Sequence, residues 1–242
     1  MTMTPTIADR ARSLLSHKHT FGHRAENTGY HLPERGTKPD VDRQYILRMM
    51  IRSPESNGLQ IPEDLEWLRI AIFCCIGEQL RKDIANPFIY VTVRHGLVTS
   101  ENDDVWHVDG FSMRTPHIPE QNYVFTSVNG TEVLNQEITL PEDFDPFTHN
   151  IHQYFQDCAD ESGNNVQVLA PGNIYCIDPY VVHRRPMIPA GTMRTFFRIS
   201  FIPVEIEDDT CTANPLIPRD KPYNRDGVTS LRDKLKRYPV AS

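Results

Sequence analysis

The sequence predicts a mainly β protein, an antiparallel sandwich or barrel with supporting helices, and three observations lead to this fold class. The chain has 242 residues, enough for one domain with a sizeable buried core. From Phe88 onward, short runs rich in β-branched and aromatic residues alternate with turn formers, a spacing typical of antiparallel sheets. Before them, apolar residues recur at three- and four-residue steps, which indicates a helix.

Composition excludes several classes of protein and partner. Twenty-five Lys and Arg against 32 Asp and Glu give a net charge of −7, which disfavours nucleic acid as a partner. The five cysteines show no C-x-x-C spacing, so neither a disulfide framework nor a cysteine zinc site is indicated. No run approaches the roughly 18 uninterrupted apolar residues of a membrane helix, and the N-terminus lacks a signal-peptide core. We therefore expect a cytoplasmic protein with no membrane partner.

The residues before the predicted strands are expected to form an arm and then supporting helices. Residues 1–40 lack apolar periodicity and are expected to form an irregular arm or lid, followed by a single domain over 41–242. Within this domain we expect support helices in 41–86, a β core at about 88–202 and a C-terminal extension over 203–242. One helix is predicted from Val41 to Met50 and a clearer one from Pro62, because proline suits the first helical position. The apolar stripe of the second helix comprises Leu65, Leu68, Ile72, Ile76 and Leu80.

The runs predicted to be strands follow in order. Turn formers separate them, and a short helix is expected near 145–155. His149 and His152 lie on that helix, and we assign them an exposed or packing role because no third ligand is close in sequence. Near the C-terminus, 230–238 is predicted to form a short solvated helix. The strand runs are 88–93, 104–109, 122–128, 131–140, 166–170, 173–178, 181–183 and 194–202.

Two of these runs carry candidate metal ligands. Because side chains alternate along a strand, His107 and Asp109 point to the same face. An imidazole and a carboxylate together suit a borderline divalent metal, and a second histidine would complete a facial triad with three open positions. His183 is the candidate, because a predicted type II turn around Pro171 and Gly172 launches the strand that leads to it.

The last strand carries two arginines on one face. Alternation places Arg194 and Arg198 together with Phe196 and Ser200 on the same side of the strand. A buried unpaired guanidinium is costly, and its planar fork suits a carboxylate. We therefore expect an anionic ligand there.

This combination resembles the non-haem Fe(II) and 2-oxoglutarate-dependent oxygenases, over roughly residues 88 to 202. The resemblance implies a double-stranded β-helix core of the jelly-roll, cupin-like kind, with Fe(II) held by His107, Asp109 and His183. It implies that Arg194 anchors the cosubstrate 2-oxoglutarate. Arg198 matches the place at which the taurine dioxygenase branch holds an anionic substrate. Other branches use an Arg-x-Ser pair for the cosubstrate, which would be Arg198 and Ser200 here.

The implied activity is oxidation of a C–H bond in a small, anionic metabolite by molecular oxygen, with release of succinate and CO₂. Aspartate at the carboxylate position of the triad favours hydroxylation, desaturation or cyclisation over halogenation. Tyr123 and Thr126 are further candidates for binding the cosubstrate, and Arg114 for binding the substrate. The arm and the loop from Gly110 to Gln121 are candidate lids. Two alternatives stay open, namely a cupin-type metalloenzyme that needs no 2-oxoglutarate and a non-catalytic ligand-binding barrel.

Overall fold

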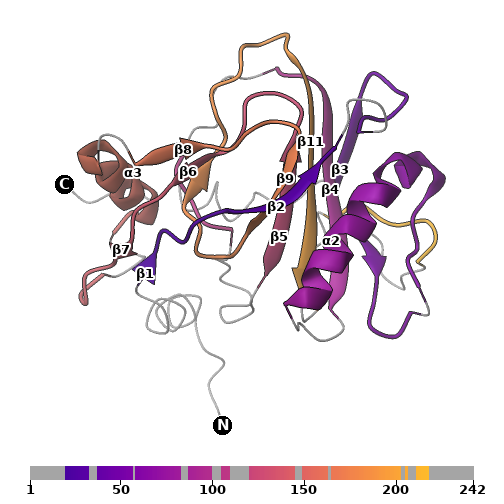
Figure 1. The fold of residues 1–242 in the computed structure, drawn as a ribbon, viewed down its shortest axis with the longest axis horizontal. Coiled ribbons are helices and arrows are strands. Elements are labelled where there is room, and N and C mark those ends of the chain that lie inside the picture. Colours follow the sequence, from indigo (N-terminus) through magenta and orange to yellow (C-terminus); the bar gives the residue numbers. More distant parts are fainter. Residues whose placement is uncertain are drawn as a thin grey trace.

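The computed structural model shows a mainly β protein with two principal antiparallel sheets and a helix packed against each of them (Figure 1). None of the helices in the described part of the chain is long and apolar enough to cross a membrane. The structure describes residues 20–32, 37–56, 58–82, 87–99, 105–109, 120–144, 149–162, 165–202, 205–206 and 211–217.

Six strands form the larger sheet. They lie in the order β2-β9-β5-β11-β4-β3, and every neighbouring pair is antiparallel. The longest pairing joins β4 and β11 over ten residues of each strand. The strands are β2 (Glu26–His31), β3 (Gln44–Arg52), β4 (Phe88–Leu97), β5 (Gln121–Thr126), β9 (Asn173–Ile177) and β11 (Met193–Ile202).

The smaller sheet has the order β10-β6-β8. His107 extends it through an isolated antiparallel bridge to His183, the first residue of β10. A separate two-stranded ribbon pairs β1 with β7. The strands are β6 (Glu132–Leu134), β8 (Val166–Val168), β10 (His183–Arg184), β1 (Thr20–Phe21) and β7 (Ile138–Thr139).

The chain winds between the two sheets in the manner of a jelly roll. It passes from β4 to the His107 segment, back to β5, across to β6 and β8, and then through β9, β10 and β11. The core of the larger sheet therefore reads β9-β5-β11-β4, and the smaller sheet reads His107-β10-β6-β8. This strand order is that of a double-stranded β-helix, so the fold class predicted from the sequence is confirmed.

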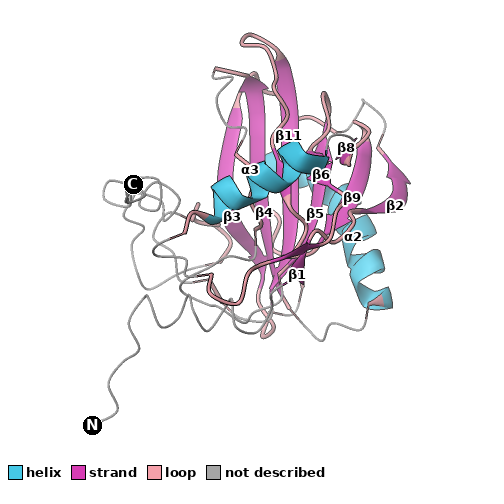
Figure 2. Ribbon diagram, turned by 90° about the vertical axis from the view of Figure 1, so that its left-hand side faces the viewer, coloured by secondary structure: helices cyan, strands magenta, loops and turns pink. Residues whose placement is uncertain are grey.

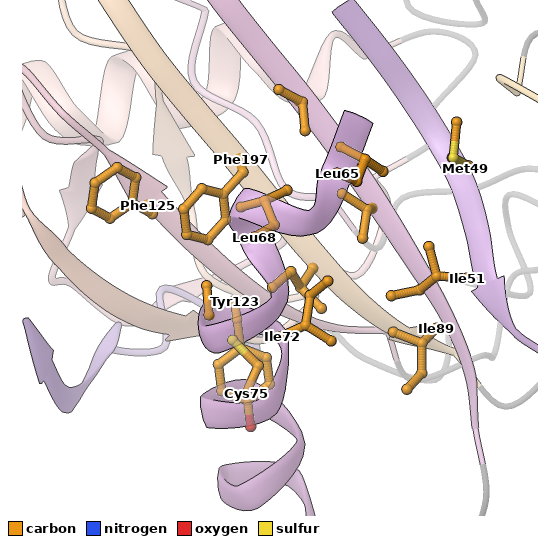
Figure 3. Close-up of a cluster of buried hydrophobic side chains, with 14 of the residues drawn as sticks. Met49, Ile51, Leu65, Leu68, Ile72, Cys75, Ile89, Tyr123, Phe125 and Phe197 are labelled. Atoms are coloured by element: carbon orange, nitrogen blue, oxygen red, sulfur yellow. The ribbon is translucent and has the colours of Figure 1, made fainter. Parts of the chain in front are cut away.

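Apolar side chains fill the space between the sheets and cover the outer face of each. Between them pack Val124, Tyr175 and Ile177 from the larger sheet with Val133 from the smaller one. A 3₁₀ turn (η1, Glu63–Leu68) and the helix α2 (Arg69–Arg81) cover the outer face of the larger sheet (Figure 3). The helix α3 (Ile151–Ser162) packs on the smaller sheet against Trp106, Leu134 and Val182 (Figure 2).

The structure of residues 41–50 differs from the prediction. The expected helix from Val41 to Met50 is wrong, because Gln44–Arg52 forms the edge strand β3. Ile46, Met49 and Ile51 are buried against the sheet, so the pairing with β4 outweighs local helical periodicity. A bulge at Arg48, whose φ is +44°, brings these apolar residues onto the sheet despite their uneven spacing.

The second predicted helix forms, with two differences. It begins as the 3₁₀ turn η1 and becomes α-helical only at Arg69. Leu65, Leu68 and Ile72 are buried as expected, whereas Leu80 is 74% exposed. The apolar stripe thus covers the sheet only over the first part of the helix, and near the end the buried position is Gln79.

Three other segments can be compared with the sequence-based expectations. Within the expected irregular arm, 20–21 and 26–31 form β1 and β2, while 1–19 lie outside the described residues. Every run predicted to be extended contains a strand except 104–109, which contains the single bridge at His107. The helix expected near 145–155 begins at Ile151. The predicted helix over 230–238 also lies outside the described residues.

The contact between the larger sheet and α2 gives a stability prediction. The Phe197 side chain is fully buried and stacks on Phe125 with ring centroids 4.7 Å apart. We expect Phe197→Ala to lower the free energy of unfolding by about 3–5 kcal/mol, because it leaves a cavity. Urea denaturation measures this change. Met193→Ala on the same strand removes a side chain that is 45% exposed and is the control, with an expected change within about 0.5 kcal/mol.

Candidate metal centre

The three residues predicted to bind metal lie together in the structure. His107 and His183 exchange two backbone hydrogen bonds, with N···O distances of 2.9 and 2.8 Å, and their rings lie 4.5 Å apart between centroids. Asp109 follows His107 by two residues and projects to the same side. One potential ligand atom from each of the three residues lies within 4.8 Å of the other two. Among the described residues, this is the group of histidine, cysteine and acidic side chains that can hold a metal ion.

Hydrogen bonds fix which nitrogen of each imidazole faces the centre. The Nδ1 atom of His107 lies 2.8 Å from the carbonyl oxygen of Val105, and that of His183 lies 2.9 Å from the carbonyl oxygen of Val181. Because a carbonyl only accepts, Nδ1 carries the proton in both rings and donates it. Nε2 of each ring is thereby left facing the centre as the ligand atom, which is the orientation that metal-binding histidines adopt.

Asp109 is held by two donors from the larger sheet. Its Oδ2 atom accepts hydrogen bonds from Nη1 of Arg198 at 2.7 Å and from Nδ2 of Asn122 at 3.2 Å. Ser200 Oγ donates in turn to Oδ1 of Asn122 at 2.5 Å. Burial by itself would raise the pKa of Asp109, but the charge of Arg198 and its hydrogen bond to the carboxylate outweigh it and hold that pKa well below its usual range. The carboxylate is therefore ionised and oriented.

The donor set suits a non-haem Fe(II) ion. Two imidazole nitrogens and one carboxylate oxygen on one side form the 2-His-1-carboxylate arrangement, which leaves positions open for other ligands. The tautomers and the ionised carboxylate supply the protonation states that binding of a divalent ion requires. On these grounds His107, Asp109 and His183 fit the ion that the sequence suggests.

Arg194 is a buried cation on the face of β11 that also carries Arg198. It is 8% exposed, its Nε atom donates to Oγ1 of Thr126 at 3.2 Å, and its guanidinium lies 5.1 Å from the ring centroid of Phe196. Burial, with repulsion from Arg185 and Arg94, lowers the pKa of Arg194 to about 10. Among the described residues no acidic side chain forms an ion pair with it. The site therefore offers a positively charged group that an anion would stabilise.

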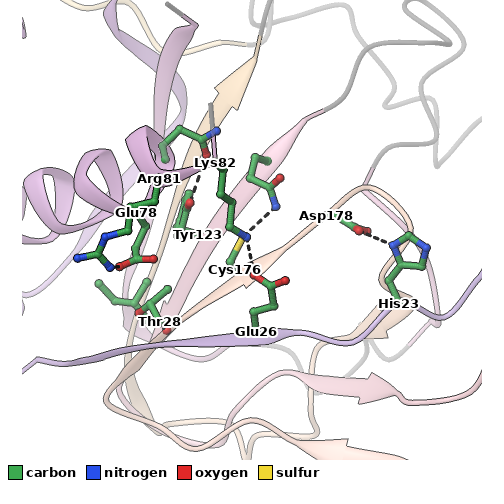
Figure 4. A network of polar contacts seen from close by, with 12 residues as sticks. His23, Glu26, Thr28, Glu78, Arg81, Lys82, Tyr123, Cys176 and Asp178 are labelled. Carbon is green, nitrogen blue, oxygen red and sulfur yellow. Dashed lines mark hydrogen bonds and ion pairs between the residues drawn. The ribbon is translucent and has the colours of Figure 1, made fainter. Parts of the chain in front are cut away.

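Thr126 and Tyr123, both predicted to bind the cosubstrate, lie on opposite faces of β5. Thr126 contacts Arg194 and donates to the carbonyl oxygen of Val128 at 2.7 Å. Tyr123 lies on the opposite face of β5, fully buried, and its hydroxyl donates to Gln79 of α2 at 3.2 Å (Figure 4). Tyr123 therefore lies on the face of β5 that packs on α2, away from the face that carries Thr126. Thr126 follows Tyr123 by three positions, an odd number, so alternation along the strand already places them on opposite faces.

Several expectations about neighbouring residues can also be assessed. Trp106 is 1% exposed and lies in the core, with the Arg184 guanidinium 4.5 Å from its ring centroid. His152 has a packing role, since its Nδ1 atom lies 2.9 Å from the carbonyl oxygen of Trp106, the residue before His107. His149 is exposed and lies beside the Phe144 ring. Arg114 and most of the predicted lid loop, 110–119, lie outside the described residues.

Among known proteins, the chain is similar to several solved structures. No family model and no curated protein matches the chain. The chain is similar to AviO1 from Streptomyces viridochromogenes Tue57, with 13% identity over 82% of this chain and 85% of that one and a TM-score of 0.36. It is also similar to EvdO2 from Micromonospora carbonacea var. aurantiaca complexed with 2-oxoglutarate, with 12% identity over 90% and 100% of the two chains and a TM-score of 0.34. The fold assignment rests on the strand order, and the function proposed below rests on the side chains.

The triad gives a metal-binding prediction. His183→Ala removes one of the three ligands, so we expect the affinity for Fe(II) or Mn²⁺ to fall by at least about 100-fold. Isothermal titration under anaerobic conditions measures this affinity. His31→Ala, which changes an exposed histidine on β2, should bind the ion as the parent protein does. Equal affinity of the His183 variant and the parent would contradict the assignment.

Proposed function

We propose that the protein is an Fe(II)- and 2-oxoglutarate-dependent dioxygenase that oxidises a C–H bond of a small, anionic metabolite. The observation that most supports this function is that a facial triad and a buried guanidinium without an acidic partner among the described residues lie in the same jelly roll. The triad is His107, Asp109 and His183, and the guanidinium is that of Arg194. A metal site alone would fit many enzymes, whereas the buried Arg194 adds a requirement for a second, negatively charged group.

The protein's own residues would hold and orient the reactants. When bound, Fe(II) and 2-oxoglutarate supply the oxidising chemistry, with molecular oxygen as oxidant and succinate and CO₂ as by-products. The Nε2 atoms of the two histidines and the Asp109 carboxylate hold the ion. Arg194 binds the far carboxylate of the cosubstrate, and Thr126 orients that guanidinium through its Oγ1. Because Asp109 fills the carboxylate position, the expected outcome is hydroxylation, desaturation or cyclisation.

The contacts of the two arginines support assigning the cosubstrate to Arg194. In the alternative, Arg198 and Ser200 would bind the cosubstrate. Arg198 already pairs with Asp109, and Ser200 already donates to Asn122. The hydrogen bond of Arg194 goes to the neutral Thr126 instead, and among the described residues no acidic side chain forms an ion pair with this guanidinium.

The charges around the site support an anionic substrate. Arg185 and Arg94 both lie close enough to repel the charge of Arg194, so three guanidinium groups gather at this end of the barrel. Arg184, by contrast, pairs with Glu132 at 2.6 Å and lies over Trp106, so its charge is already balanced by an acidic partner. A positive field in a partly enclosed site raises the local concentration of small anions. We therefore propose substrates that carry a carboxylate, sulfonate or phosphate.

Formation of the chelate and turnover of the cosubstrate test the proposed function directly. Anaerobic addition of Fe(II) and then 2-oxoglutarate should produce a visible charge-transfer band, and admission of oxygen should release succinate. The band is recorded by absorption spectroscopy and succinate by mass spectrometry, with His183→Ala as the negative control. Absence of both the band and succinate in the parent protein would reject the proposal and favour a non-catalytic barrel.

Arg194 distinguishes the proposal from a cupin-type enzyme that needs no cosubstrate. Arg194→Ala removes the guanidinium that would bind the far carboxylate, so we expect the KM for 2-oxoglutarate to rise by about 100-fold, the loss of a charge-assisted pair. Arg194→Lys, which keeps the charge without the planar fork, should lie between the two. Steady-state succinate formation measures both. Unchanged kinetics in Arg194→Ala would contradict the assignment.

A further inference from the structure

Asp109 is paired with a cation supplied by the protein itself. Nη1 of Arg198 lies 2.7 Å from its Oδ2 atom, and the exposed fractions of the two side chains are 14% and 13%. In such a buried position an ion pair is screened far less than at the surface. The carboxylate that would neutralise a metal ion is thus already neutralised by a guanidinium.

A divalent ion and the guanidinium make opposing demands on Asp109. The ion would share this carboxylate with Arg198 and would be repelled by it, because both are positive and would lie beside the same carboxylate. In a buried site such repulsion between close charges is large. Arg198 therefore lowers the affinity of the triad for metal, even though it keeps the carboxylate ionised.

Orientation of Asp109 does not depend on Arg198 alone. Asn122 donates to the same Oδ2 atom, and Ser200 fixes the Asn122 side chain through its Oδ1. These two neutral groups come from β5 and β11, both in the larger sheet. Loss of Arg198 would accordingly remove a positive charge from the site while a neutral hydrogen-bond donor still holds the carboxylate.

We infer that Arg198 competes with the metal ion for the charge of Asp109, so that the ion binds a carboxylate that it must share with an internal cation. This inference rests on the proposed metal site and adds to it a control on metal loading. It gives Arg198 a role that differs from the substrate-binding role suggested by the sequence. It also predicts opposite effects for two neighbours of one carboxylate, since removal of Arg198 strengthens metal binding and removal of Asn122 weakens it.

Metal affinity in the absence of any cosubstrate tests the inference. Mn²⁺ is the probe, and isothermal titration gives its dissociation constant for each variant. Arg198→Gln should bind Mn²⁺ at least about tenfold more tightly than the parent protein, because a nearby positive charge is gone. Arg198→Lys keeps the charge and should bind no more tightly than the parent. Asn122→Ala should bind at least about tenfold more weakly, as expected when a partner that orients a ligand is lost.

Two controls distinguish the loss of the Arg198 charge from an effect of the substitution on folding. Arg69→Gln removes the same charge from an exposed ion pair with Glu66 and should leave the affinity unchanged. In Arg198→Ala, millimolar guanidinium ion should refill the space and weaken Mn²⁺ binding toward the parent value, whereas uncharged urea should not. The circular dichroism spectrum of each variant confirms that it is folded.

The outcomes are distinct. Parent protein that binds no Mn²⁺ would overturn the metal site and the inference with it. Parent protein that binds Mn²⁺ while Arg198→Gln binds equally would show that Arg198 does not compete and would leave the proposed function standing. Weaker binding by Arg198→Gln would show that Arg198 chiefly orients Asp109, which also overturns the inference. Guanidinium rescue of the Arg198→Ala variant gives the same answer where the Gln variant does not fold.

Discussion

Two backbone hydrogen bonds between His107 and His183 hold the candidate site together. They join a segment without extended pairing of its own to β10, and so bring both imidazoles to one edge of the smaller sheet. The side chain of each histidine then bonds to a carbonyl oxygen two residues earlier in its own segment. Ring orientation is therefore set locally, while the approach of the two rings is set by the sheet.

Burial of charge is the second constraint on the site. Asp109 and Arg198 lie between the sheets, and Glu120, which is 8% exposed, adds a further negative charge close to Arg198. Arg48 lies 3.7 Å from Glu120 and continues the alternation of charges toward the edge strand β3. Buried ions are tolerated when such partners are present. Arg194 differs from this group because the charges that act on it among the described residues, those of Arg185 and Arg94, are positive.

Much of the candidate site could be predicted from sequence because strands alternate their side chains. That rule places His107 with Asp109, and Arg194 with Arg198 and Ser200, on common faces, and the structure agrees. The same rule, carried through β5, places Asn122 and Thr126 inside and Tyr123 outside. What the sequence does not contain is the pairing between strands, which brings Asn122 and Arg198 to Asp109. Long-range contacts of this kind depend on register, and no local pattern encodes it.

The strands likewise differ in whether local sequence patterns or contacts with distant residues determine them. The strands from Phe88 to Ile202 follow local patterns of β-branched and aromatic residues bounded by turns. β3 does not, since its apolar residues repeat almost as a helix would and become a strand only because β4 offers a free edge. Sequence periodicity could not predict this, because the outcome depends on a partner that lies later in the chain.

The irregularities of the outermost strands matter beyond the site. Both edges of the larger sheet have interrupted ladders, β2 between Asn27 and His31 and β3 on either side of Met49 and Met50. A broken edge presents no continuous row of backbone donors and acceptors to another molecule. The distortion that lets β3 bury its uneven apolar residues thereby also guards this broad sheet against adding strands from neighbouring molecules and aggregating.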